Sequence, residues 1–361
     1  MREGWTYKKF EDCLVKAPKA KQVQTSEYNA GSKYPIISQE DKMISGYCDD
    51  SSLLYHIDCP IVIFGDHTRV LKYVDFDFVV GADGVKILIP KDFLRAKYLF
   101  YYLQWYKIPS LGYSRHYKLL KEINIPVPPL SEQQRIVSEL DLLSSIIEKK
   151  KAQLKEYDQL TQSIFYHMFG DPITNEKGWE VKKLGDVGII VAGSTPSTND
   201  ESNWDGHVNW VTPAELGEQL YYGETARKLT DKGAKGLTMM PVGTVLLSSR
   251  APIGKLAITT VPMCCNQGFK NIICNNTINN VFLYYYLKNT MDLVQALGRG
   301  ATFKEVSKSA ISSYKIILPP LSLQQSFAEK IETIEHQKAL IQQSIAETET
   351  LFNSRMDYYF N

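Results

Sequence analysis

Two pairs of polar loops hold the side chains of this 361-residue chain that are best suited to chemistry. In each half of the sequence, one loop joins two apolar, strand-like runs, at residues 65–72 and 248–255, and another follows a tyrosine-rich run, at residues 114–118 and 298–304. Arginine can bind guanine through two parallel hydrogen bonds, and Ser, Thr and Lys can bind phosphate oxygens or base edges. An ordinary solvated loop is the alternative for any single residue. For the loops as a set, DNA contact is the favoured interpretation. The candidate DNA-binding residues are His67, Thr68, Arg69, Lys72, Ser114, Arg115, His116, Lys118, Ser248, Ser249, Arg250, Lys255, Arg299, Thr302 and Lys304.

Motifs that would indicate catalysis are missing from the sequence. There is no phosphate-binding G-x-x-x-x-G-K-[ST] loop, no G-x-S-x-G nucleophile motif and no zinc-binding H-E-x-x-H helix. Gly298 and Gly300 begin a dinucleotide-binding pattern, but no third glycine follows at the required spacing. Asp75 and Asp77 share one face of a predicted strand with no third ligand nearby, so a solvated strand face is the favoured interpretation. A hydrolase is therefore the least favoured class of function.

Composition places the chain among ordinary globular proteins. Its length suggests two or three domains, and 44% hydrophobic residues are enough to build their cores. No run approaches the length of a membrane span, and residues 1–10 have no apolar segment typical of a secretory signal. The six cysteines show no zinc-binding spacing and are too sparse for a disulfide scaffold. We therefore expect reduced thiols, a cytoplasmic location and no membrane partner.

An internal repeat is the strongest pattern in the sequence. Residues 128–134 read PPLSEQQ and residues 319–325 read PPLSLQQ, and the match continues without a gap to Phe169 and Phe360. Upstream, the sequence Trp-Thr-Tyr-Lys-Lys near the start of the chain resembles the later Trp-Glu-Val-Lys-Lys. Two copies of one design therefore follow each other. The predicted parts are a globular domain at 1–130, a helix at 131–170, a second globular domain at 171–321 and a second helix at 322–361.

Each Pro-Pro-Leu sequence opens a segment that reads as one long helix. Residues 131–169 contain no Gly or Pro, and apolar residues recur at alternating spacings of three and four, as in a coiled-coil seam. Ser131 and Gln134 fit a capping box in the first turn. Because neither apolar stripe is stable in water, we predict that the two helices pack antiparallel, with the globular domains up to about 60 Å apart. Polar interruptions that could fix the register are Lys150, Thr161, Lys338 and Thr348.

The globular domains read as mixed α and β structure. Tyrosines at 101–102 and 284–286 lie at helical spacing near apolar residues, so core packing is their favoured role. The predicted fold class is α+β, with two mixed α/β domains at opposite ends of a long antiparallel two-helix coiled coil and a pseudo-two-fold internal repeat. The runs that predict strands are 60–64, 85–90, 243–247 and 271–274, and those that predict helices are 95–106 and 281–297.

This duplicated design resembles the specificity (S) subunit of type I restriction–modification systems, over essentially the whole chain. The resemblance rests on residues 128–135 and 319–325, on the junction at 168–172 leading to Gly-Trp, and on the Gly-Ser-Thr-Pro sequence at 193–196. Two departures are small: Leu323 stands where the first copy has Glu132, and the first domain lacks the Gly-Ser-Thr-Pro sequence. The resemblance implies that the globular parts are target-recognition domains.

The resemblance also implies a function and a set of partners. It implies a non-catalytic subunit that reads a bipartite target in double-stranded DNA, with one half-site for each domain. The implied partners are two methyltransferase (modification) subunits, which methylate adenine, and restriction subunits with ATP-driven translocation. No cofactor is implied on this chain, because S-adenosylmethionine, ATP and Mg would belong to the partner subunits. In this family the helices serve as a spacer and as a docking surface for the modification subunits.

The charge of the chain is distributed unevenly among its parts. The formal net charge is only +1, but the globular segments carry +3 and +2, whereas the helices carry −1 and −3. This modest positive charge predicts weak DNA binding by the isolated chain, with base or shape readout and the partners adding to phosphate attraction. The alternative function is a coiled-coil scaffold whose domains bind proteins, for which DNA binding would show no steep decrease with salt.

Overall fold

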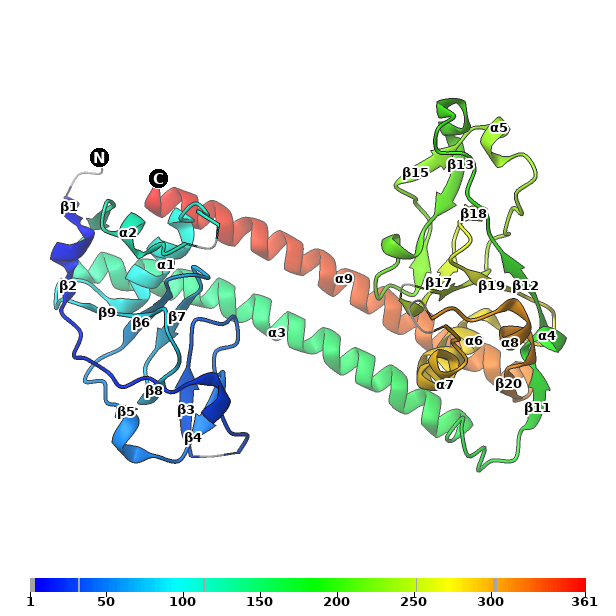
Figure 1. The fold of residues 1–361 in the computed structure, drawn as a ribbon, viewed down its shortest axis with the longest axis horizontal. Coiled ribbons are helices and arrows are strands. Elements are labelled where there is room, and N and C mark those ends of the chain that lie inside the picture. Colours follow the sequence, from blue (N-terminus) through cyan, green and yellow to red (C-terminus); the bar gives the residue numbers. More distant parts are fainter. Residues whose placement is uncertain (1–3, 32, 113, 251, 301–303) are drawn as a thin grey trace. The chain divides into compact units, whose positions relative to one another are not determined.

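The structure is a computed structural model, and it describes residues 4–31, 33–112, 114–250, 252–300 and 304–361. The chain forms two compact units (Figure 1). The first unit comprises residues 1–151 and 343–361, and the second unit comprises residues 152–342. Each unit therefore contains one globular domain together with a part of each long helix.

The globular domain of the first unit combines short strands with helices. Its strands are β1 (Thr6–Lys9), β2 (Leu14–Val15), β3 (Tyr34–Ile37), β4 (Gly46–Cys48), β5 (Leu54–Tyr55), β6 (Ile61–Gly65), β7 (Leu71–Val74), β8 (Phe78–Val80), β9 (Val85–Pro90) and β10 (Asn124–Val127), and its helices are α1 (Ala96–Tyr106) and α2 (Tyr117–Leu120). One sheet has the antiparallel order β2-β9-β6-β7, and another has the order β4-β3-β8-β5, in which β3 and β8 are parallel. Strand β1 pairs with β10, directly before the first long helix.

The globular domain of the second unit has a related but larger arrangement. Its strands are β11 (Glu180–Lys183), β12 (Gly188–Ala192), β13 (Trp204–Val211), β14 (Tyr221–Tyr222), β15 (Arg227–Leu229), β16 (Val245–Ser249), β17 (Ile253–Thr259), β18 (Cys264–Cys265), β19 (Lys270–Cys274) and β20 (Lys315–Leu318), and its helices are α4 (Leu184–Val187), α5 (Asp231–Ala234), α6 (Asn280–Asn289), α7 (Met291–Ala296) and α8 (Lys308–Ser313). The sheet orders are β12-β19-β16-β17-β14 and β15-β13-β18, and β11 pairs with β20 as β1 does with β10.

Helix α1 closes the core of the first domain with its tyrosine-rich face. Tyr98 and Leu99 lie four and three residues before Tyr102, so both share a face of the helix with it, and all three are buried. The Tyr98 hydroxyl donates to the carbonyl of Pro126 (2.9 Å) and the Tyr102 hydroxyl to that of Asn124 (2.8 Å), which ties α1 to β10. Burial raises the pKa of Tyr102 to about 12. Tyr101 is buried as well, so the core role predicted for the tyrosines at 101–102 is confirmed.

The corresponding helix of the second domain is interrupted where the sequence predicted continuity. One helix was expected over 281–297, but α6 ends at Asn289 and α7 begins at Met291. Thr290 separates them with a φ of −115°, and its hydroxyl donates to the carbonyl of Tyr286 (2.9 Å). This local bond competes with the regular helical pattern. The tyrosines at 284–286 are buried, as predicted.

The two long helices are α3 (Leu130–Phe169) and α9 (Leu321–Phe360), with bounds within one or two residues of those predicted. In the first unit, the start of α3 packs antiparallel to the end of α9: Glu139 binds the Arg355 guanidinium, and the hydroxyl of Tyr359 donates to Glu139 (2.5 Å). The predicted polar interruption Lys150 hydrogen-bonds to Ser344 of the facing helix. Among the described residues, no helix is long and apolar enough to cross a membrane.

The second unit contains the other halves of the long helices, again antiparallel. Phe165 of α3 is fully buried against Phe327 of α9, with ring centroids 5.7 Å apart. The predicted polar interruption Lys338 donates to Asp158 and to Glu335, both at 2.9 Å. Both a buried aromatic contact and paired polar groups therefore occur between the two helices, as the coiled-coil pattern predicts.

The repeated Pro-Pro-Leu-Ser-x-Gln-Gln sequence fastens each long helix to its own globular domain. Gln133 is fully buried; its amide nitrogen donates to the carbonyls of Phe93 (2.8 Å) and Pro128 (2.9 Å), and its oxygen accepts from the N–H of Arg95 (2.8 Å). Gln324 makes the equivalent bonds in the second unit. The predicted capping box is wrong, because both helices start one residue earlier, at the leucine before Ser131 and Ser322.

Candidate nucleic-acid interface

The loop between β6 and β7 places Thr68 and Arg69 at the surface of the first domain. It closes through hydrogen bonds from the N–H of Arg69 to the carbonyl of Gly65 (2.7 Å) and from the N–H of Gly65 to that of Val70 (2.8 Å). Arg69 has a φ of 64°, a left-handed conformation that residues other than glycine seldom adopt. Its guanidinium donates to the carbonyl of Ile108 (3.0 Å), and the side chain is otherwise exposed. The guanidinium of Arg69 can therefore donate hydrogen bonds to an acceptor outside the protein.

Lys72 lies at the base of the same loop but points inward. Its side chain is buried, and its ammonium donates to the carbonyls of Ser38 (2.9 Å) and Lys42 (2.5 Å). Burial lowers its pKa. The side chain therefore holds residues 38–42 against β7, and its position does not support the predicted direct contact with DNA. His67, in the same loop, is half-buried, and its backbone N–H donates to the side-chain oxygen of Gln39 (3.2 Å).

The second loop of the first domain, at 114–118, also contains both accessible and buried candidate side chains. Those that reach the surface are Ser114, Arg115 and Lys118. His116 is fully buried: its Nε2 accepts from the N–H of Leu111 (3.0 Å), so the ring proton lies on Nδ1, which donates to the carbonyl of Asp66 (2.9 Å). His116 therefore connects the two loops, and its burial corrects the expectation that it faces DNA.

The predicted loop at 248–255 of the second domain spans the end of β16 and the start of β17, and it also contains both buried and accessible side chains. Ser248 is fully buried, and its hydroxyl donates to the carbonyl of Pro252 (2.7 Å) and accepts from the N–H of Lys255 (2.8 Å), which closes the turn. Ser249 is also buried, so neither serine is placed to touch DNA directly. Thr302 lies outside the described residues. The candidate donors that remain at least partly accessible are Arg250, Lys255, Arg299 and Lys304.

The structure brings the two predicted loops of each domain together. In the first domain the N–H of His116 donates to the carbonyl of Asp66 (2.8 Å), and in the second the N–H of Val306 donates to that of Ser249 (3.0 Å). Loops about 50 residues apart in the sequence therefore form one surface in each domain. Four residues that join them were missed because sequence reasoning sought donors at the surface: Asp66, Lys86, Lys270 and Glu305.

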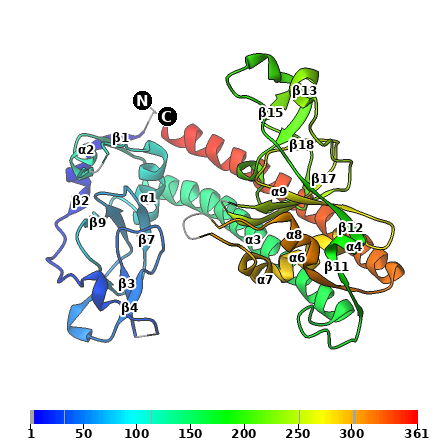
Figure 2. The same ribbon diagram turned by 45° about the vertical axis from the view of Figure 1, so that its right-hand side comes forward.

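A further exposed cation lies on the antiparallel pair of strands β13 and β15, which stands away from α6 and α7 in both ribbon views (Figures 1 and 2). The guanidinium of Arg227 lies 3.6 Å from the ring centroid of Trp204 and 5.7 Å from that of Trp210. The indoles donate to the carbonyls of Ser197 (3.2 Å) and Ser194 (3.1 Å), within the Gly-Ser-Thr-Pro loop. The loop thus supports an aromatic platform that holds one arginine at the surface.

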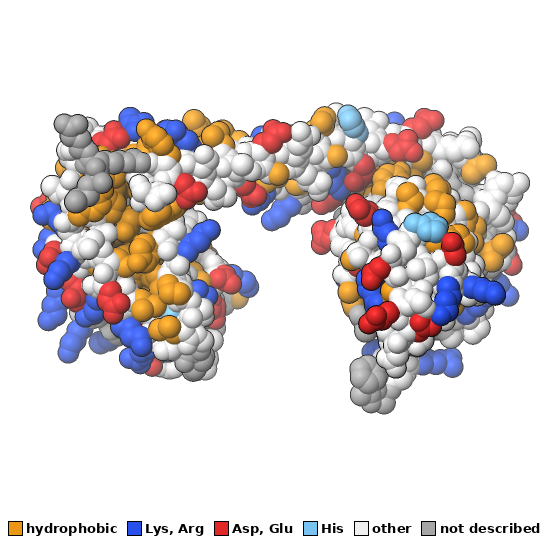
Figure 3. All heavy atoms as spheres, turned by 90° about the horizontal axis from the view of Figure 1, so that it is seen from above, with side chains coloured by type: hydrophobic (Ala, Val, Ile, Leu, Met, Phe, Trp, Pro, Cys, Tyr) orange, Lys and Arg blue, Asp and Glu red, His pale blue; other side chains and the backbone are white. Residues whose placement is uncertain are grey.

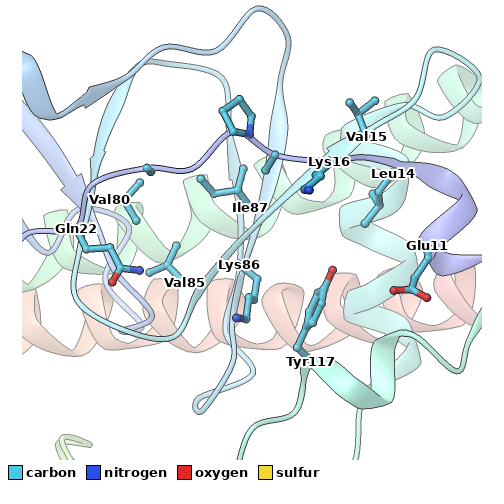
Figure 4. A pocket seen from close by; sticks show the side chains of 13 residues that line it. Glu11, Leu14, Val15, Lys16, Gln22, Val80, Val85, Lys86, Ile87 and Tyr117 are labelled. Atoms are coloured by element: carbon cyan, nitrogen blue, oxygen red, sulfur yellow. The ribbon is translucent and has the colours of Figure 1, made fainter.

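A cavity of about 430 Å³ opens beside β2 and β9 of the first domain (Figure 4). Its polar lining residues are Glu11, Lys16, Gln22, Lys86 and Tyr117. The ammonium of Lys86 lies 5.6 Å from the ring centroid of Tyr117, and the rest of the lining is largely aliphatic. The lining contains no serine, threonine, cysteine or histidine, so it offers no hydroxyl or thiol nucleophile paired with an imidazole base. Within the described residues, no group of three His, Cys, Asp or Glu side chains is placed to hold a metal ion.

The surface carries both signs of charge. Figure 3 shows lysine and arginine side chains spread over each unit, with acidic side chains between them. This distribution agrees with the small net positive charge of the globular segments. Phosphate attraction without base or shape readout would therefore be weak.

Comparisons with known proteins give a consistent result. A family model described as the type I restriction modification DNA specificity domain matches twice, at residues 2–156 and 176–350. The specificity subunit of the type I restriction enzyme MjaIX from Methanocaldococcus jannaschii is 40% identical over 158 residues, which is 42% of this chain and 37% of that protein. The EcoR124I/EcoR124II specificity subunit of Escherichia coli is 24% identical over 93% of this chain and 88% of its own length.

Solved structures share the fold at low sequence identity. The type I restriction–modification S subunit from M. genitalium matches with a TM-score of 0.61 and 15% identity, over 98% of this chain and 95% of that one. A chain from a study of complex assembly and conformational transition in a type I system matches with a TM-score of 0.58 and 18% identity, over 100% and 98% of the two chains. These similarities confirm the fold class predicted from the repeat.

Proposed function

Because the chain belongs to the type I restriction–modification DNA specificity family, we propose that it reads a bipartite DNA target with one recognition domain for each half-site. The observation that carries this proposal is the duplication itself. The family model matches each half of the chain, and each half presents a pair of joined loops with accessible Arg and Lys side chains. Arginine at such positions suits guanine, and the loop backbone and lysines suit phosphates.

The chemistry of the system belongs, in this proposal, to other subunits. The accessible side chains of the joined loops are hydrogen-bond donors without a neighbouring nucleophile–base pair, which suits recognition rather than bond breaking. S-adenosylmethionine would be bound by modification subunits, and ATP and Mg by restriction subunits. The scaffold alternative receives no support from the comparisons, since all the relatives described above are specificity subunits or parts of type I systems.

Two modification subunits would dock on the chain, one for each repeat. Three pairs of apolar residues are exposed at equivalent positions of the two repeats, where core packing does not explain them. The pairs are Tyr7 with Val181, Leu130 with Leu321, and Leu160 with Leu351, and their exposed fractions lie between 36% and 50%. Exposed apolar positions that recur in both copies indicate a repeated contact with a partner. The repeated exposed pairs therefore support the binding of two modification subunits to each chain.

Sequencing of methylated bases tests the proposed function. Cells that express this chain with its modification subunit should contain adenine methylation at one bipartite motif, and cells without the chain should lack it. The motif gives both half-sites and the length of the spacer between them. If methylation did not depend on the chain, or if the motif had a single continuous part, the proposal would be wrong.

A further inference from the structure

In the first domain, Asp66 joins the two loops at one buried point. Its N–H donates to the carbonyl of Gly84 (2.7 Å), and its own carbonyl accepts from the N–H of His116 (2.8 Å). Its carboxylate accepts from the N–H of Tyr117 (2.7 Å) and lies 3.6 Å from the ammonium of Lys86. The β6–β7 loop, the end of the loop between α1 and α2, and strand β9 therefore meet at this residue.

The second domain repeats this junction around Ser249. Its N–H donates to the carbonyl of Gly268 (2.7 Å), and its carbonyl accepts from the N–H of Val306 (3.0 Å). The ammonium of Lys270 donates to its hydroxyl (3.2 Å). Gly268 and Lys270 stand at the same sequence offset from Gly84 and Lys86, so the backbone bonds and the lysine are the same in both copies.

The carboxylate, however, has a different origin in the two domains. Ser249 carries no charge, and the acid that faces Lys270 is Glu305 from the other loop, with one oxygen 3.1 Å from the ammonium. The second oxygen of Glu305 lies 3.9 Å from the guanidinium of Arg250. Lys270 is buried, and a buried ammonium without a carboxylate would be costly. Both junctions therefore contain an ion pair with the equivalent lysine, but the acid comes from a different loop in each domain.

The position of Glu305 is hard to explain by DNA contact alone. Its side chain is 42% exposed on a surface where a free carboxylate would repel phosphates. Beside Arg250, which is 38% exposed, it can instead fix the direction of the guanidinium before DNA arrives. A guanidinium that is already held in one orientation loses less conformational entropy than a mobile one when it binds a base edge through two hydrogen bonds. Backbone bonds between Glu305 and Arg299 (3.0 and 3.1 Å) hold the carboxylate in place.

We infer that Asp66 and Glu305 are equivalent positioning residues that join the two DNA-reading loops of each domain, and that Glu305 acts through Arg250. The inference rests on the proposed function, because it assigns roles to residues within that interface. It concerns recognition by each domain separately. Loss of the acid in one domain should therefore weaken one half-site and leave the other intact.

The test uses the complex of the full chain with its modification subunits and the motif that the wild-type complex methylates. Glu305→Gln keeps the shape and removes the charge. We expect the variant to bind the target about tenfold or more weakly and to bind unrelated DNA as the wild type does. Methylation should then tolerate base changes in one half-site only. Glu224→Gln, an exposed acid of the same unit, is the matched control and should behave as wild type.

A double-mutant cycle decides whether Glu305 acts through Arg250. If it does, Arg250→Ala and the double variant Arg250→Ala/Glu305→Gln should bind the target equally. Additive losses would overturn the inference, as would tighter binding of Glu305→Gln to all DNA, which would indicate simple phosphate repulsion. Wild-type behaviour of Glu305→Gln would overturn it too, whereas a wild-type complex without a bipartite motif would instead defeat the proposed function.

A relocation variant provides a second measurement. Ser249→Asp/Glu305→Gln moves the carboxylate to the loop that supplies it in the first domain, again beside Lys270. Recovery of discrimination at the affected half-site, relative to Glu305→Gln, supports the positioning role, since a direct contact of Glu305 with DNA would not be restored. No recovery in a variant that melts as the wild type does would overturn the equivalence of Glu305 and Asp66, whereas the double-mutant cycle decides whether Glu305 acts through Arg250.

Discussion

Gln133 and Gln324 are the residues on which the start of each long helix depends. Each is fully buried, and each side chain satisfies backbone groups of the loop before α1 or α6 as well as a carbonyl of its own Pro-Pro sequence. The neighbouring Gln134 and Gln325 are exposed. The two glutamines of the repeated sequence therefore have different roles, of which only the first concerns stability.

Gln133→Leu should lower the free energy of unfolding by about 1–3 kcal/mol, because buried N–H and C=O groups lose their partners. Gln324→Leu should do the same in the second unit. Denaturant or thermal unfolding measures the change. Gln134→Leu is the matched control, and as a surface substitution it should change stability by no more than about 0.5 kcal/mol. Equal losses for Gln133 and Gln134 would contradict the assignment.

At this scale the sequence selects the right loops but not the direction of each side chain. Residue type and loop position identify Arg69 and Arg250 as donors, and both reach the surface. The same criteria select Lys72 and His116, which are buried against carbonyls from elsewhere in the domain. Their orientation depends on segments about 30 to 50 residues away, Ser38 and Asp66 among the partners, so local patterns could not predict it.

At the scale of elements, the ends of the two long helices could be predicted from the sequence, whereas the interruption at Thr290 and the pairing of strands could not. The long helices follow from uninterrupted Gly- and Pro-free segments, and α3 ends where Gly170 adopts a φ of 77°. Strand β1, by contrast, pairs with β10, with Thr6 opposite Val127. Such non-local pairing leaves no periodic signal within either strand, so topology had to come from the structure.

The exposed leucines of the long helices support a prediction about assembly. Leu160→Glu or Leu351→Glu should each reduce the number of bound modification subunits from two to one, because a charge placed in an apolar contact opposes docking. The double variant should bind neither. Native mass spectrometry of the complex gives the stoichiometry directly.

The matched control for docking is Leu142→Glu on α3. Leu142 is 62% exposed, but the equivalent position of α9 is Thr333, so it is not part of a repeated apolar pair. This variant should bind two modification subunits. If it lost a subunit as readily as Leu160→Glu, exposed leucines in general, and not the repeated positions, would explain the effect.

At the scale of the whole molecule, the chain is one design used twice. The duplicated family match, the paired β1–β10 and β11–β20 ribbons and the two glutamine anchors all repeat. The repeat was visible in the sequence because the helices tolerate little change in spacing. The two domains have diverged more, which fits the reading of two different half-sites.

Deleting one heptad from each helix, residues 149–155 and 340–346, should shorten the gap between half-sites. Seven residues span about 10 Å of helix, and a gap about three base pairs shorter is expected if the helices set the spacing. Methylome sequencing measures the gap. An unchanged gap in a variant that still methylates would show that the helices do not act as a ruler, and deletion from one helix alone should destabilise the chain.

The transfer of the acid from one loop to the other has a consequence for engineering. Residues 298–305 moved alone into the first domain would bring a second carboxylate beside Asp66, and the reverse exchange would leave Lys270 without an acid. Either graft would create a local charge imbalance in a buried site. Variants with new specificity that are built by exchanging parts between the two halves should therefore receive both loops together with the strand that carries the lysine, β9 or β19.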